Sequence, residues 1–369
     1  MMPPILMKNC LFPTTLFRRA THVETVKSAA HRQPILALVC ALLLAPLAAA
    51  HAADPFDELA ALSSLPKDKL DRAKLEKGET VWVRSPGMNF QRGQCIESAF
   101  VVEAPVEKTL ESLREWNVTA HPDLKVYLHT DIPGAPGPAD FSKLASAPSN
   151  SAVKSLVAAT SKLGSGSSEL QLSSSDLEGA PKKGDGKGVM TPEIVSFWTG
   201  VLERRSRAFA GGGAPALPPY NIGDQKIAPG AELSSLLATQ PKIRNQFKSI
   251  IETVGASGKP SKPSLYWEML DSQGQASLNL GASVFSSPGK TAQAADLQYY
   301  SSNSYFVYLT VYQMWGIQVG SKPATLIWRA DLISSGELAN LHGIERNASG
   351  AALGKEIDKL NSYFQKDTR

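Results

Sequence analysis

The sequence is poor in cysteine and histidine, and this limits the chemistry that it can carry. Three cysteines and six histidines occur among its 369 residues. No C-x-x-C or H-x-x-x-H spacing is present, so the patterns typical of zinc and dithiol sites are missing. We therefore expect no bound metal and no cofactor.

Catalytic motifs are scarce as well. The chain has no G-x-S-x-G nucleophile elbow and no complete phosphate-binding loop. The sequence identifies no catalytic residue and favours a protein that is not an enzyme. An enzyme would need a serine or a carboxylate beside His121, His129 or His342 in the folded chain.

Apolar stretches are short. The longest one without charge, Ile35–Leu47, has 13 residues, whereas a membrane span needs about 20. Arg32 precedes it and Ala50-His51-Ala52 follows it, which is the three-part pattern of an export signal. We predict that residues 1–52 are a signal peptide. The chain from Ala53 onwards is then periplasmic or secreted, without a transmembrane anchor.

The chain has no net charge once that segment is set aside. The formal charge of +4 comes from the predicted signal peptide. Its charged residues are Lys8, Arg18, Arg19, Lys27 and Arg32 against Glu24. The remainder has equal numbers of acidic and basic residues, which gives no reason to expect nucleic acid or an anionic membrane as a partner. Of the cysteines Cys95 alone remains, so an internal disulfide is excluded.

The chain after residue 52 divides into four parts by composition. Residues 53–77 form a charged helical lead-in, and residues 78–132 hold strand patterns with one helix. Residues 133–263 are a linker and helical insertion rich in Gly, Ser and Pro, and residues 264–366 hold strands and a long helix. We predict strands at Thr80–Val83, Cys95–Val102, Leu124–Ile132, Leu265–Leu270, Ala276–Phe285, Tyr305–Trp315 and Thr325–Ile333, and a closing helix over Gly336–Phe364. The fold class is α+β: an antiparallel meander packed on a long C-terminal helix, with a large, mainly helical insertion.

Several polar side chains are expected to face solvent. Asn279 and Ser283 alternate with apolar residues, so one face of their strand is predicted to be wet. Arg329 and Asp331 are expected to point outward for the same reason. Glu203–Arg207 resembles an ordinary i,i+4 pair on a solvated helix face, where its arginines would meet water.

The final helix is unusual in its glycines. Gly343, Gly350 and Gly354 each cost roughly 1 kcal/mol relative to alanine in a helix. We interpret them as places where the helix approaches the sheet closely.

Two segments resemble the START-like (SRPBCC) superfamily. In Phe100-Val101-Val102-Glu103-Ala104-Pro105-Val106-Glu107-Lys108 a strand ends in Ala-Pro and opens a helix, and Thr325–Leu332 leads into the final helix. The resemblance covers residues 78–132 and 264–366, and the segment 133–263 has no counterpart in it. It implies a curved antiparallel sheet that grips a long C-terminal helix (the helix-grip fold), with a cavity between them for an apolar ligand. It carries over no catalytic residue, because the family shares a shape rather than a motif.

Aromatic residues gather in the last hundred residues and have two interpretations. As a pocket lining they would hold an apolar small molecule or a lipid. As core they would pack one strand on both faces. The predicted ligand-binding residues are Trp267, Leu278, Phe306, Tyr308, Tyr312 and Trp328. We expect an exported, non-enzymatic protein that binds or carries an apolar molecule. The alternative is an envelope structural or interaction protein with a solid core and no ligand, and no pattern indicates an oligomeric state.

Overall fold

The computed structural model describes residues 53–85, 88–163, 169–181, 188–287 and 289–369. The predicted signal peptide lies outside these residues, so its assignment stays a prediction. None of the described helices combines the length and the apolar character that a membrane crossing needs.

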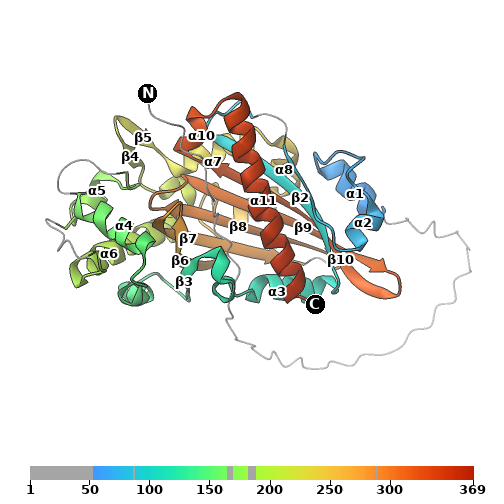
Figure 1. Cartoon of the computed structure of the whole chain (residues 1–369), viewed down its shortest axis with the longest axis horizontal. Helices are drawn as coiled ribbons and strands as arrows, with labels where there is room; N and C mark the ends of the chain where they lie inside the picture. The colour runs from blue at the N-terminus through green and yellow to red at the C-terminus, as the bar shows by residue number, and fades with distance from the viewer. Residues whose placement is uncertain (1–52, 86–87, 164–168, 182–187, 288) are drawn as a thin grey trace, which may run out of the picture.

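One antiparallel sheet of eight strands forms the centre of the molecule (Figure 1). Its strand order is β1-β2-β10-β9-β8-β7-β6-β3, and every neighbouring pair is antiparallel. The strands are β1 Val81–Arg84, β2 Gly93–Val102, β3 Val126–Ile132, β6 Ser264–Ser272, β7 Gln275–Ser286, β8 Thr291–Ser301, β9 Val307–Val319 and β10 Lys322–Ser334. With the helices around it, this sheet confirms the predicted α+β class.

The strand order joins the two predicted parts of the domain. The five consecutive strands β6 to β10 form a meander, because short turns connect them. The turn at Gln273-Gly274 joins β6 to β7, and its φ angles of 55° and 86° are both positive, as a type I′ hairpin requires. At one edge β10 pairs with β2, and at the other β6 pairs with β3. Segments far apart in the sequence therefore build one sheet.

The sequence patterns did not predict β8. Its residues Thr291–Ser301 include three alanines and two glutamines before the aromatic pair, and these residue types have little preference for strands. Both neighbours, β7 and β9, pair with it. Tertiary pairing on both sides therefore fixes its extended conformation.

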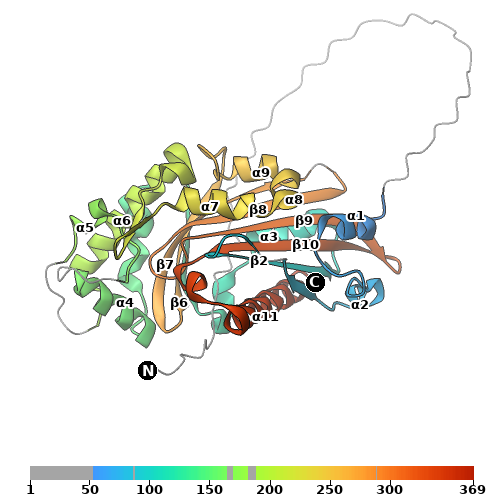
Figure 2. The same ribbon diagram turned by 90° about the horizontal axis from the view of Figure 1, so that it is seen from above.

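The helices cover the two faces of the sheet differently (Figures 1 and 2). On one face, here called the α11 face, α11 (Gly343–Asp367) packs on β1 and β2. On the opposite face, here called the insertion face, α4 packs on β6 and β7, α7 on β9 and β10, and α9 on β7 and β8. The other helices and a small hairpin are α1 Pro55–Leu62, α2 Arg72–Glu76, α3 Val106–Glu115, η1 Val118–Ala120, η2 Pro122–Leu124, η3 Pro138–Ser146, α4 Ser151–Ser161, α5 Ser174–Leu177, α6 Pro192–Gly212, η5 Ala214–Ala216, β4 Tyr220–Ile222, β5 Gln225–Ile227, α7 Pro229–Ala238, α8 Pro241–Gln246, α9 Lys248–Thr253 and α10 Gly336–Asn340.

The predicted closing helix is in fact two helices. It breaks after Asn340, because Leu341 and His342 have extended backbone conformations. Gly343 then starts α11 with a φ of 50°, a conformation that other residues rarely adopt. The break turns the chain so that α11 can cross the sheet.

Gly350 and Gly354 allow α11 to lie close to β1, as predicted, whereas the prediction was wrong for Gly343, where a Cβ would meet nothing within 4 Å. A Cβ at Gly354 would come within 2.4 Å of the Trp82 ring, and a Cβ at Gly350 within 2.8 Å of the Arg84 side chain. A larger residue at either position would push the helix away from the sheet.

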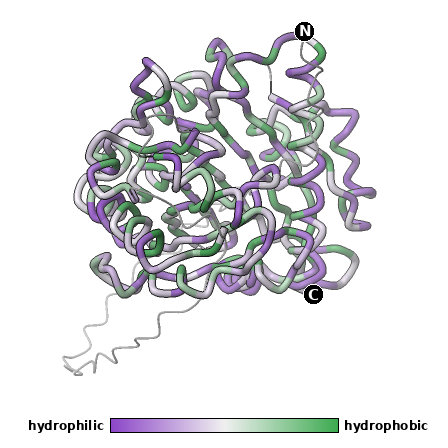
Figure 3. The backbone as a smooth tube through the Cα atoms, turned by 60° about the vertical axis from the view of Figure 1, so that its left-hand side comes forward, coloured by the Kyte–Doolittle hydropathy of each residue, from purple (hydrophilic) through white to green (hydrophobic). Residues whose placement is uncertain are grey.

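The main hydrophobic core lies on the insertion face. There the helices of the insertion pack against alternate side chains of the strands, among them Trp267, Leu278 and Trp328, all of which are fully buried. The α11 face has two smaller apolar clusters. Figure 3 shows apolar and polar stretches alternating along the chain, as strands with two different faces require.

Candidate functional site

A row of polar side chains crosses the α11 face near one edge of the sheet. His129 of β3 lies directly opposite Glu268 of β6, and Glu268 lies opposite Asn279 of β7. Residues opposite each other in a sheet share a face, so these three side chains stand next to one another. Glu268 and Asn279 are fully buried.

His129 lies between two carboxylates. Its Nδ1 is 3.7 Å from Oε2 of Glu268, and its Nε2 is 3.7 Å from Oδ1 of Asp131. The ring also stacks on Tyr266, with 5.4 Å between the ring centroids. Burial by itself lowers the pKa of His129, but the two carboxylates outweigh it and raise the pKa to about 9. The imidazole is therefore cationic at neutral pH.

Glu268 connects this histidine to the centre of the sheet. Burial raises its pKa, and the His129 cation partly offsets that effect. Its Oε1 accepts a hydrogen bond of 3.3 Å from Nε2 of Gln298, whose carbonyl accepts one from the Tyr305 hydroxyl. Its other oxygen, Oε2, has no hydrogen-bond partner.

Several buried polar atoms in this region have no hydrogen bond within 3.5 Å, although four of them face one another in the two ion pairs of His129. They are both ring nitrogens of His129, Oδ1 of Asp131, Oε2 of Glu268, Nδ2 of Asn279 and Oγ of Ser283. All five residues belong to β3, β6 and β7 and point to the same face. A buried polar group without a partner costs about 1–3 kcal/mol, so native proteins rarely leave several together. We call these five residues the polar cluster.

The neighbouring charged groups of the α11 face are fully paired. Arg329 donates to both oxygens of Asp331, at 2.7 and 2.8 Å. Tyr308 and Thr310 donate to the same carboxylate, and Arg329 also donates to Asn361 of α11 at 3.3 Å. This group fastens the helix to the sheet, whereas the polar cluster is left incomplete.

Three predictions of solvent exposure were wrong. Asn279 and Ser283 are buried rather than on a wet face, and Arg329 and Asp331 are buried near α11. Arg205 is buried as well. Strand alternation correctly separated the two faces, but it did not show that a helix and the curvature of the sheet would exclude water from the polar one.

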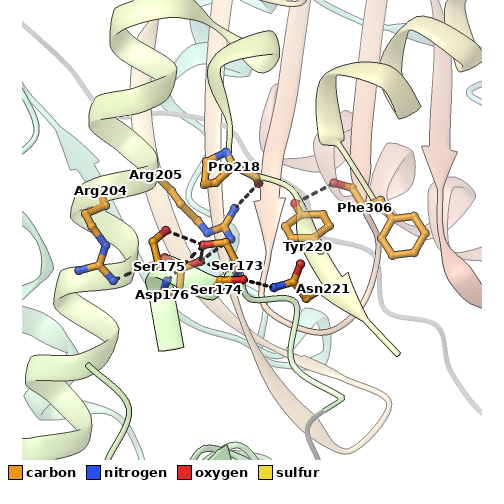
Figure 4. A network of polar contacts seen from close by, with 10 residues as sticks. All are labelled: Ser173, Ser174, Ser175, Asp176, Arg204, Arg205, Pro218, Tyr220, Asn221 and Phe306. Carbon is orange, nitrogen blue, oxygen red and sulfur yellow. Dashed lines mark hydrogen bonds and ion pairs between the residues drawn. The ribbon is translucent and has the colours of Figure 1, made fainter. Parts of the chain in front are cut away.

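Arg205 belongs to a second buried network, which ties the insertion to the sheet (Figure 4). Its Nη2 donates to Asp176 of α5 at 2.5 Å, and its Nη1 donates to the carbonyl of Pro218 at 3.3 Å. The guanidinium lies over the rings of Tyr300 and Tyr220, at 4.4 and 5.2 Å from their centroids. The network therefore joins α5, α6, β4 and β8, and we interpret it as stabilising the fold.

The structure does not bring the six predicted ligand-binding residues together. Trp267, Leu278, Phe306 and Trp328 belong to the core of the insertion face. Tyr308 and Tyr312 lie on the α11 face, in its two apolar clusters. Their role in ligand binding stays a prediction, and a single cavity on one side of the sheet can be lined by either group but not by both.

A shallow cleft of about 360 Å³ lies elsewhere, between the start of α3 and the ends of β8, β9 and β10. Its lining residues are Pro105, Val106, Glu107, Lys290, Gly316, Ile317, Gln318, Pro323 and Ala324. None of the six predicted residues is among them, and neither is any member of the polar cluster.

Sequence reasoning missed the polar cluster, although one signal was present. Glu268 is a charged residue inside a predicted apolar strand. Burying a carboxylate there costs free energy unless the charge is paired or hydrogen-bonded. An enzyme would need a carboxylate or a serine beside a histidine, and two histidines have such a neighbour. His129 lies 3.7 Å from Glu268, and Nε2 of His121 lies 2.7 Å from Oδ2 of Asp367. Among the residues that the structure describes, no group of histidine, cysteine and acidic side chains has the arrangement of a metal site.

No known family model and no curated protein sequence matches this chain.

Proposed function

We propose that this protein binds a small molecule on the α11 face of its sheet, at the polar cluster, in the manner of a helix-grip protein. The fold supports this proposal. A first long strand, β2, pairs with the last strand, β10, while the next strand, β3, closes the opposite edge beside β6. The insertion between β3 and β6 leaves that order intact, and α11 crosses the face on which a helix-grip protein holds its ligand.

The observation that carries the proposal is the set of unpartnered polar atoms. Six buried atoms of five neighbouring side chains have no hydrogen bond within 3.5 Å, and four of them belong to the two ion pairs of His129 at 3.7 Å. Bound molecules or ordered water complete such groups in proteins. A ligand with polar groups at this place would add hydrogen bonds to the polar atoms that those ion pairs leave out.

The side chains on the α11 face change the kind of ligand that we expect. The resemblance implies an apolar ligand, and Tyr308 and Tyr312 would supply aromatic surface for an apolar part. The polar cluster, by contrast, requires a part with hydrogen-bonding groups. We therefore propose a ligand with a polar end and an apolar body, carried rather than converted.

Native mass spectrometry of the protein purified from its own source tests this proposal. We expect an extra mass that organic extraction removes. Asn279→Leu, which removes an unpartnered donor at nearly constant volume, should reduce the bound fraction at least tenfold. Leu280→Met is the matched control, because this adjacent side chain belongs to the core of the insertion face. Equal ligand content in both variants would contradict the proposed site.

A second candidate is the structural or interaction protein without a ligand. The filled core of the insertion face favours it, since Trp328 stacks on Phe247 with 5.5 Å between centroids and Trp267 donates to the carbonyl of Asp140 at 2.8 Å. A bare polypeptide mass, unchanged after incubation with envelope extract, would support this candidate instead.

A further inference from the structure

We infer that the cleft at the tip of the β9–β10 hairpin binds the extended C-terminal tail of another protein. The tail would add to the free edge of β9 and end with its carboxylate beside Lys290. This cleft contains no member of the polar cluster, so the inference does not depend on the proposed function.

The end of β9 has an edge without a neighbouring strand. β9 pairs with β10 over its whole length, whereas its pairing with β8 stops at Trp315. The N–H of Gly316 still donates to the carbonyl of Lys290 at 3.0 Å. Backbone groups alternate in direction along a strand, so the N–H and C=O of Gln318 point to the same side as those of Gly316. No strand of the described chain lies there, and the hairpin tip projects from the sheet (Figure 1).

The other edge of the same hairpin is protected. Lys322 and Pro323 of β10 lie beyond the pairing with β2, which starts at Thr325. A lysine and a proline at a sheet edge oppose the addition of another strand, because proline has no N–H to donate. The β9 edge has neither residue type at Gly316 and Gln318, both of which are exposed. The hairpin is therefore open to an added strand on its β9 side.

The cleft provides room for the side chains of such a strand. It has a volume of about 360 Å³ and lies between the end of β9 and the start of α3. Pro105 and Val106 at the start of α3 and Ala324 of β10 form its apolar part. Every second side chain of an added strand would point into it, since successive side chains alternate between faces. A tail of about four residues with small apolar side chains matches the free length of β9, residues 316–319, at about 3.4 Å per residue.

Lys290 favours a peptide with a free C-terminus. It directly precedes the first residue of β8 and so occupies the line that an added strand would follow. A peptide on that line must therefore end or turn away there. If the peptide runs antiparallel to β9, its C-terminal end meets the exposed Lys290, and the ammonium group stabilises the carboxylate. A parallel peptide would place its own ammonium group there and be repelled. Glu107, which also lines the cleft, partly opposes the carboxylate.

Affinity selection from synthetic peptides tests the inference. The probes are a library of random hexapeptides with free C-terminal carboxylates and the same library as C-terminal amides. Peptides retained by the purified protein are identified by mass spectrometry and resynthesised, and fluorescence anisotropy gives their Kd. We expect the acid library to yield peptides with small apolar residues, and amidation of a selected peptide should weaken its binding at least tenfold. Retention of no peptide, or equal binding of acid and amide, would overturn the inference.

Backbone and charge variants test whether the peptide lies on this edge. Gln318→Pro removes the N–H that would pair with the peptide and should weaken binding at least tenfold, whereas Gln318→Ala should change Kd less than threefold. The hairpin should persist in both variants, because Gln318 lies opposite Pro323, at a position without hydrogen bonds between the two strands. Lys290→Glu should weaken binding at least tenfold. Lys322→Glu, the same charge change on the β10 side of the tip, is the matched control and should have little effect.

A change in the peptide serves if Gln318→Pro does not fold. Methylating alternate backbone nitrogens of the selected peptide removes either the donors that face β9 or those that face away from it. We expect one methylation pattern to weaken binding at least tenfold and the other to be tolerated. Tolerance of both patterns, or unchanged binding to a folded Gln318→Pro variant, would overturn the inference.

Discussion

At the scale of single residues, a few polar side chains that alternate with core residues give the α11 face its polar character. Glu268 stands between Trp267 and Met269, which are buried on the insertion face. The same strand therefore contributes tryptophan to one core and a carboxylate to the other face. Gly281 shows how tightly this face is packed, because a Cβ there would come within 1.8 Å of the Tyr266 ring that stacks on His129.

The charge on His129 makes a prediction about pH. Its pKa in the folded protein, about 9, is above the ordinary value of 6.5, so its stabilising contribution is complete below pH 6.5 and is lost as the pH rises through 9. Relative to a His129→Gln/Glu268→Gln double variant, the free energy of unfolding should fall by about 3 kcal/mol over that interval. Urea unfolding followed by tryptophan fluorescence between pH 6 and 10 measures this difference. The double variant is the reference because burial raises the pKa of Glu268, which would add its own pH dependence if it were left without the cation.

A control keeps the result specific to His129. His342 is exposed at the start of α11, so His342→Gln should give the same pH profile as the wild-type protein. Parallel profiles for the wild-type protein and the double variant would show that His129 is not held as a cation by Asp131 and Glu268.

At the scale of elements, α11 and the insertion are held to the sheet by different means. The helix approaches β1 through glycines and is fixed to β10 by the Arg329–Asp331–Asn361 contacts. The insertion uses a large apolar core and the buried pair of Arg205 and Asp176. Each means of attachment allows its own test.

The close approach of α11 predicts an unusual response to a glycine substitution. Gly354→Ala should destabilise the protein by about 1–3 kcal/mol, because the new Cβ would overlap the Trp82 ring and the helix would have to move. Gly211→Ala in α6 is the matched control, since a Cβ there meets nothing within 4 Å. Alanine's better helix propensity should make that variant as stable as the wild type or more stable by up to about 1 kcal/mol. Thermal unfolding compares the two, and equal behaviour would contradict the packing argument.

The buried ion pair predicts a large effect in the insertion. Asp176→Ala leaves the fully buried Arg205 without its carboxylate and should cost about 3–5 kcal/mol of unfolding free energy. Glu203→Ala removes the partner of Arg207, whose side chain is 61% exposed, and should cost less than about 1 kcal/mol. The double substitution Asp176→Leu/Arg205→Met should restore most of the loss, because no unpaired charge remains. A small cost for Asp176→Ala in urea unfolding would mean that water reaches the arginine.

At the scale of the whole molecule, two segments of the sequence build one sheet around a long insertion. The edge strands β2 and β3 come from the first segment and the meander from the last. The insertion covers one face, whereas α11, α3 and the polar cluster lie on the other (Figure 2). This division separates a filled apolar core from a face whose hydrogen bonds are incomplete.

The export prediction also belongs to this scale. Cleavage after Ala52 should give a protein that starts at Ala53 outside the cytoplasm, which cell fractionation and N-terminal sequencing would show. Ala52→Arg should block processing, because the peptidase reads a small residue there, whereas Ala53→Ser should not. Retention of residues 1–52 in the fractionated wild-type protein would contradict the prediction.

Local patterns in the sequence were enough to predict most of the strands, the α+β class and the close approach of the final helix, because each of these depends on short-range periodicity or on glycine. They did not determine β8, whose residues have weak strand preference and depend on two neighbours. They also did not determine which polar side chains are buried. Alternation assigns a side chain to a face, but only the tertiary structure decides what covers that face. For this reason His129 from one segment and Glu268 and Asn279 from another became a candidate site only once β3, β6 and β7 lay side by side.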